Sequence, residues 1–198
     1  MPTMLMDCPR CWAKKKDCTL CKGKGKVPDR YLSPNFKLSE MLSTGIGRKK
    51  GLANDPSPQI EKNLERLCKE ALEPIRAISG PLKVNSGYRS DAVNKAVGGS
   101  TTSAHSFGLA ADLHPLKTTW KGLMDMVIGS GRVLDQVIFE QTWVHVGLAH
   151  PKYKKPRGDR LSMFRVNGKP TYERYNPNDP RILAAQGGDE DEEEGADA

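Results

Sequence analysis

Three side chains of types that commonly bind metals limit how this chain can fold. His105 precedes Asp112 by seven positions, and His145 follows Asp112 by 33 positions. Asp112 lies in an apolar run, residues 109–113, that predicts a buried strand, and His145 lies on a second predicted strand. Two imidazoles and one carboxylate would leave a divalent metal one open position for water, as in a catalytic zinc site. We therefore expect a fold that gathers these residues around one zinc ion.

A second metal site is predicted near the start of the chain. Four of the five cysteines form two C-x-x-C pairs, Cys8 with Cys11 and Cys18 with Cys21. In a reducing compartment such pairs are more often metal ligands than disulfides, and two pairs complete a four-thiolate structural zinc site. We assign residues 1–30 to a zinc-finger module. Its basic side chains leave two roles open, a structural module with a solvated face or a docking or nucleic-acid-binding finger.

The charge of the chain is distributed unevenly. Seven of its 24 acidic residues lie within residues 189–197, so the rest carries 31 Lys and Arg against 17 Asp and Glu, a net charge of +14. So basic a body suits an anionic partner, either nucleic acid or the acidic polymers of a bacterial wall. Residues 187–198 contain only Gly, Asp, Glu and Ala, a composition that predicts a disordered acidic tail.

No apolar run approaches the roughly 20 residues that cross a bilayer, and the first residues lack the regions of a signal peptide. We therefore expect a chain with no membrane partner that begins in the cytoplasm.

Hydrophobic periodicity predicts one α+β domain over residues 31–186, an antiparallel sheet with helices packed to one side. Ser57 and Pro58 indicate the start of a long helix that Pro74 should kink, and Asn167-Gly168 is a strong hairpin signal. Residues 28–34 resemble a linker, and the Gly-rich, basic residues 44–51 indicate a loop. The other expected helices lie within residues 36–42, 90–97 and 118–128, and the expected strands at 82–86, 109–113, 135–140, 143–148, 160–166 and 169–175.

Four motifs occur in the order S-G-Y-R-S (86–90), G-G-S (98–100), S-x-H-x-x-G-x-A-x-D (103–112) and W-V-H-V (143–146). With them, residues 36–148 resemble the zinc D-alanyl-D-alanine carboxypeptidases and phage L-alanyl-D-glutamate endopeptidases. These share a fold with lysostaphin-type peptidases and the hedgehog signalling domain. Separately, the Gly-rich run after Cys21 resembles the cysteine-rich zinc module of J-domain co-chaperones, which transfers no chaperone activity.

The peptidase resemblance implies roles for particular residues of these motifs. It implies that His105, Asp112 and His145 bind zinc, that Arg89 binds the substrate or transition state, and that Ser103 bonds the substrate. Tyr88 and Trp143 are further candidates to line the substrate groove, although core packing would explain both equally well.

Hydrolysis also needs a general base, for which Glu140 is our candidate. The family usually has an acidic residue three positions before the last histidine, where this chain has Thr142. Glu140 and His145 would face opposite sides of a continuous strand. If Gln141 and Thr142 form a two-residue hairpin loop, however, Glu140 pairs with Trp143 and its side chain shares a face with His145.

The function expected is zinc-dependent hydrolysis of an amide bond in the peptide stem of bacterial peptidoglycan, with two zinc ions per chain. The resemblance suggests a phage endolysin or virion-associated lysin, located in the host cytoplasm before lysis or in the virion, where other virion proteins would be its partners. Two alternatives stay open. One is a non-catalytic virion structural or binding protein that retains the metal, and the other is a nucleic-acid-binding protein that acts through the basic finger.

Overall fold

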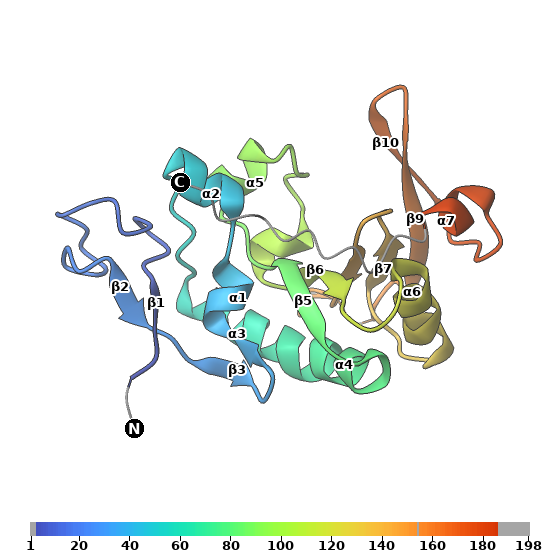
Figure 1. Cartoon of the computed structure of the whole chain (residues 1–198), viewed down its shortest axis with the longest axis horizontal. Helices are drawn as coiled ribbons and strands as arrows, with labels where there is room; N and C mark the ends of the chain where they lie inside the picture. Colours follow the sequence, from blue (N-terminus) through green and yellow to red (C-terminus); the bar gives the residue numbers. More distant parts are fainter. Residues whose placement is uncertain (1–2, 154, 186–198) are drawn as a thin grey trace.

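The computed structural model describes residues 3–153 and 155–185, so the predicted acidic tail lies outside the described residues. Within the described part, no helix is long and apolar enough to cross a membrane. Figure 1 shows strands β1 (Leu5–Asp7) and β2 (Lys26–Pro28) at one end of the molecule and β10 (Lys169–Arg174) at the other. The main sheet begins at β10 and extends toward the other end.

That sheet has six strands in the order β10-β9-β7-β8-β6-β5. The remaining strands are β5 (Leu82–Ser86), β6 (Ala110–Pro115), β7 (Gln136–Phe139), β8 (Val144–Gly147) and β9 (Asp159–Val166). Four of its five pairings are antiparallel, whereas β7 and β9 run parallel. This corrects the prediction of a purely antiparallel sheet. Because β8 ends beside Gln136, where β7 begins, the chain enters β9 from that same end and runs parallel to β7.

Both predicted hairpins have the expected register. Ile138 pairs with His145 and Phe139 with Val144, which leaves Gln141 and Thr142 in the loop. At the second hairpin, Val166 pairs with Lys169 across Asn167 and Gly168, both of which have positive φ. Positive φ at both central positions is the requirement of a type I′ turn, which explains the Asn-Gly sequence.

The sheet separates a core face from a cleft face. On the core face, every second residue of β6, β7 and β8 is buried in the main core: Ala111, Leu113, Val137, Phe139, Val144 and Val146. Against them packs the helical layer, which comprises α3 (Pro58–Leu67), η1 (Cys68–Leu72), α4 (Glu73–Ser79) and α6 (Trp120–Gly129). Because side chains alternate along a strand, Asp112, Ile138 and His145 project from the opposite face.

The long helix begins and continues as its sequence predicts. The Ser57 side chain accepts a hydrogen bond from the Ile60 amide, and Pro58 is the first helical residue. A π-helical turn, η1, ends two residues before Pro74, where the sequence predicts a kink. Proline has no amide hydrogen to complete the regular bonding pattern, and a π turn is one way in which a helix accommodates such an interruption.

Two segments differ from their predicted structure. Residues 44–51 contain helix α2 (Gly45–Lys50). Thr44 caps its first turn, Gly51 ends it at φ +65°, and three basic residues in its last turn interact favourably with the negative end of the helix dipole. Residues 28–34 contribute β3 (Tyr31–Ser33), which pairs with β4 (Phe36–Lys37) and buries Leu32. Neither segment is the loop or linker that its Gly and Pro content suggested.

Four short helices complete the described structure. Helix α1 (Leu38–Leu42) lies within the predicted helical residues 36–42 and contributes Met41 to the core. Ser90 caps α5 (Asp91–Ala96), and the 3₁₀ turn η2 (Ala104–Phe107) carries His105. Helix α7 (Pro180–Ala184) buries Ile182 beyond β10.

Candidate functional site

The three predicted metal ligands meet on the cleft face of the sheet. Asp112 on β6 and His145 on β8 are paired across the two strands, while η2 brings His105 over them. The His105 Nε2 atom lies 3.2 Å from Asp112 Oδ1 and 3.2 Å from His145 Nδ1. Asp112 Oδ1 and His145 Nδ1 are 2.9 Å apart. We call these residues the His–Asp centre.

This donor set fits a zinc ion. Tetrahedral zinc with bonds of about 2.0–2.1 Å to nitrogen and oxygen requires ligand atoms about 3.3–3.4 Å apart. The three observed separations are close to that value. All three side chains are buried, and such a group of donor atoms without a shared cation would be costly to desolvate.

Hydrogen bonding orients His105 as a ligand. Its Nδ1 atom lies 2.7 Å from the Gly87 carbonyl oxygen, which can only accept a hydrogen bond. Nδ1 therefore carries the proton, and the lone pair of Nε2 points toward the centre. Burial lowers the pKa of His105, which favours the neutral imidazole that metal binding needs.

Asp112 is held in its ionised form. Burial alone would raise its pKa, but interactions with His105 and His145 outweigh that effect and keep the pKa far below its ordinary value. The two carboxylate oxygens have different partners, because Oδ1 faces the histidines and Oδ2 accepts a hydrogen bond of 2.6 Å from Arg89.

Arg89 lies at the edge of the centre. Its Nε donates to Ser86 Oγ at 2.9 Å, and Nη2 lies 3.0 Å from His105 Nε2 as well as against Asp112. The side chain is 17% exposed and lines the cleft. Arg89 thus orients the Asp112 carboxylate and is also placed to meet an anionic group entering the cleft.

Glu140 lies beside the centre at the end of β7. Its amide donates to the Trp143 carbonyl at 3.0 Å, which continues the predicted register and places its side chain on the face that carries His145. Glu140 lines the cleft, and burial raises its pKa. A raised pKa brings a carboxylate closer to the range in which it can both accept and return a proton.

The turn after Glu140 is strained. The Thr142 amide donates to the Glu140 carbonyl at 2.8 Å, and Gln141 between them has φ +65°. Hydrogen bonding over three residues around a positive φ is typical of the rare classic γ-turn. Such backbone strain often occurs at functional sites, where the surrounding structure holds it in place.

The other predicted substrate contacts lie in different places. Ser103 and Trp143 both line the cleft, and the indole nitrogen of Trp143 is buried without a hydrogen-bond partner among the described residues. Tyr88 packs in the main core, 9% exposed, and is not among the residues that line the cleft. The structure therefore brings Ser103 and Trp143 to the site but leaves Tyr88 as a packing residue.

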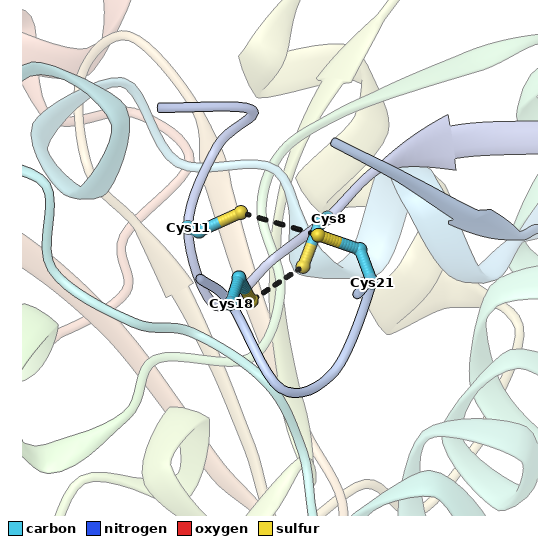
Figure 2. A group of neighbouring side chains, drawn as sticks. All are labelled: Cys8, Cys11, Cys18 and Cys21. Carbon is cyan, nitrogen blue, oxygen red and sulfur yellow. Dashed lines mark hydrogen bonds between the residues drawn. The ribbon is translucent and has the colours of Figure 1, made fainter. Parts of the chain in front are cut away.

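The four cysteines form a second candidate centre. Figure 2 shows their sulfur atoms converging between the two knuckles of the module. The Sγ atoms of Cys8 and Cys18 are 3.8 Å apart, and those of Cys11 and Cys21 are 3.6 Å apart. A tetrahedral zinc site with bonds of about 2.3 Å to sulfur requires about 3.8 Å between ligands, so this donor set also fits zinc.

One buried side chain near the site was missed by sequence reasoning. Asn54 lies just before the predicted helix start at Ser57, and it is fully buried and bonds the backbone on both sides of Arg89. An Asn-Asp-Pro sequence before a capped helix gives no hint of a partner 34 residues away. Only the fold could show it.

Comparison with known proteins identifies this arrangement. A family model described as Peptidase M15 matches residues 34–147, which is more than half of the chain and includes the whole His–Asp centre. The cysteine module lies outside the matched residues. A search of curated proteins finds no match.

Proposed function

This chain belongs to the peptidase M15 family, whose members are zinc metallopeptidases, and on that premise we propose that it hydrolyses an amide bond in the peptide stem of bacterial peptidoglycan. The observation that carries the proposal is the meeting of His105, Asp112 and His145 in a cleft that Glu140 and Arg89 also line. An origin as a phage lysin, acting from the host cytoplasm or a virion, is part of the proposal and rests only on the resemblance to phage endopeptidases.

The residues of the site divide the work of hydrolysis among them. When bound by the His–Asp centre, zinc supplies a Lewis acid that polarises the scissile carbonyl and makes water more acidic. Glu140 accepts a proton from the attacking water and returns it to the nitrogen of the leaving amine as the C–N bond breaks. Arg89 holds a substrate carboxylate or the oxygen that becomes negative at the reacting carbonyl.

The charge of the cleft supports an acidic peptide as substrate. Besides the site residues, its lining includes the basic side chains of Lys152, Lys155 and Arg165. Peptidoglycan stems carry free carboxylates, which such side chains would attract. The cleft extends over β9 and β10, which contribute Leu161, Met163, Arg165, Pro170 and Tyr172 to its lining.

We further propose that Cys8, Cys11, Cys18 and Cys21 hold a second, structural zinc ion, because four protein ligands leave no open position for catalysis. The basic finger is an alternative nucleic-acid-binding surface. However, three of its cations already bond within the protein, since Arg10 contacts Asp55, Lys14 donates to the Arg48 carbonyl, and Lys26 contacts Asp7. These contacts favour the structural role.

The direct test is digestion of purified sacculi by the zinc-loaded protein, followed by mass spectrometry of the released peptides. The new termini identify the bond that is cut. We expect His145→Ala to abolish release and His114→Ala to retain it, because His114 bonds Trp120 and is not part of the centre. Intact sacculi after incubation with the wild-type protein would refute hydrolysis and favour a non-catalytic binding protein.

A further inference from the structure

The cysteine module is bonded to one loop of the peptidase domain, residues 52–55. The Pro9 carbonyl accepts a hydrogen bond of 2.7 Å from the Asn54 amide, and the Trp12 indole donates to the Leu52 carbonyl at 2.8 Å. Both Pro9 and Trp12 belong to or adjoin the first cysteine knuckle. The knuckle therefore holds this loop by its backbone.

A third contact holds the same loop through the side chain of Asp55. The Arg10 guanidinium donates to Asp55 Oδ2 from Nε at 3.0 Å and from Nη2 at 2.6 Å. Trp12 and Ala13 have positive φ values of 50° and 61°. L-residues rarely adopt this conformation, so surrounding interactions must hold it in place. A metal ion bound by the four cysteines would supply such an interaction, because metal binding and folding are coupled in sites of this kind.

Residues 52–55 are in turn hydrogen-bonded to residues 87–90. The Asn54 Nδ2 atom donates to the carbonyls of Leu42 and Tyr88 at 3.0 Å each, and its Oδ1 accepts from the Ser90 amide at 2.7 Å. The Ser90 hydroxyl donates back to the Ala53 carbonyl at 2.7 Å. One fully buried amide thus bonds the residues immediately before and after Arg89.

Residues 87–90 are the segment that orients the His–Asp centre. The Gly87 carbonyl fixes the His105 ring, the Arg89 amide donates to the His105 carbonyl at 3.2 Å, and the Arg89 side chain holds Asp112. Gly87 packs so closely on α1 that an added Cβ would lie 2.5 Å from the Met41 carbonyl oxygen. The turn has no room to move toward α1, and Asn54, which also bonds the Leu42 carbonyl at the end of that helix, ties the turn to it.

We infer that the cysteine module is a support for the catalytic centre: through residues 52–55, with Asn54 as the positioning residue, it fixes the turn that orients His105 and Arg89. The inference builds on the two metal sites of the proposed function. According to this inference, the module keeps the side chains of the His–Asp centre in position and has no separate binding activity. Outer contacts of this kind typically change metal affinity or activity by 10- to 100-fold.

The test uses the full chain and two readouts that do not require hydrolysis. The first is hydrogen exchange of the Arg89 and Ser90 amides. The second is the affinity of the His–Asp centre for cobalt(II), read from the d–d absorption of that site. We expect Asn54→Ala to speed exchange at Ser90 about tenfold, because one buried hydrogen bond is lost, and to weaken cobalt binding about tenfold.

Replacing the cysteines of the module tests whether its effect reaches the His–Asp centre through residues 52–55 and Asn54. Cys18→Ser with Cys21→Ser should reproduce both effects at the distant centre, whereas Cys68→Ala, which removes a buried cysteine outside the module, should change neither. Ser79→Ala is the control for the loss of a buried hydrogen bond elsewhere, since the Ser79 hydroxyl donates to the Ile75 carbonyl within α4, and it should change neither readout. If the double cysteine variant does not fold, Trp12→Phe, which keeps the ring and removes its donor, should give the same changes at reduced size.

Unchanged exchange at Ser90 and unchanged cobalt affinity in Asn54→Ala or in the folded module variant would overturn the inference. Hydrolysis of sacculi by the wild-type protein would remain a separate result, so failure of the inference and failure of the proposed function can be told apart.

Discussion

Replacement of Glu140 by Gln is the sharpest test of the proposed chemistry. The two side chains have nearly the same shape, and Gln cannot accept a proton from water. Glu140 is diagonal to His145 in the hairpin register, because it pairs with Trp143 two positions away. Diagonal neighbours lie about 7–8 Å apart, which leaves space for water between the Glu140 carboxylate and the centre.

A positioned general base contributes about 10²- to 10⁴-fold to the rate. Glu140→Gln should therefore lower kcat on purified muropeptides by that factor, which raises the activation free energy by about 3–5 kcal/mol. Zinc content should stay the same, because Glu140 is not one of the three metal ligands. KM should change little, since the cleft-lining side chains of Arg89, Ser103 and Trp143 are retained.

The assay is the initial rate of peptide release, measured by liquid chromatography, with zinc content determined on the same samples. Asp135→Asn is the matched control, because Asp135 also lines the cleft but is paired with Arg157. We expect this control to keep wild-type kcat. Wild-type turnover by Glu140→Gln would refute the assignment of the base and the hairpin argument that supports it.

Three further outcomes follow from the same structure. Gln141→Gly should raise the free energy of unfolding by about 1 kcal/mol in urea titrations, because glycine adopts φ +65° without strain; a destabilised variant would contradict the strained turn. Burial alone would raise the pKa of Asp135, but hydrogen bonds from Arg157 lower it below its ordinary value, so the pair stabilises the fold above about pH 4 and loses this contribution as the pH falls. Asp135→Asn should therefore cost about 1 kcal/mol at pH 7 and flatten the acid limb of the stability profile, whereas an unchanged limb would argue against the pair. Removal of both metals by a chelator should abolish peptide release and lower Tm, with recovery on adding zinc; full activity after complete removal would exclude a metal-dependent reaction.

The sequence predicted most of the site because its determinants are local patterns. The alternation of apolar residues around Glu140 and His145 fixed the register of their hairpin, and the two C-x-x-C pairs predicted the cysteine cluster. The parallel pairing of β9 with β7 could not be predicted in this way, because it depends on where β8 ends in space. Helix α2 was missed because Gly45, Gly47 and Gly51 suggest a loop when their capping and packing are unknown.

The contacts between the cysteine module and the peptidase domain were also beyond sequence reasoning. Asn54 bonds two other parts of the chain, Leu42 and residues 88–90, through backbone carbonyls and an amide, which nearly every residue type offers. Tyr88 illustrates the converse, because its position next to Arg89 in the motif suggested the substrate groove while its side chain is buried in the core.

The most direct test of the account is the location of zinc in a crystal of the zinc-loaded protein, determined from anomalous scattering at the zinc absorption edge. We predict one peak bonded to His105, Asp112 and His145 with an open position toward the cleft, and a second among the four cysteines. The absence of a peak at the His–Asp centre in zinc-saturated crystals would contradict the central claim that these three residues hold the catalytic metal.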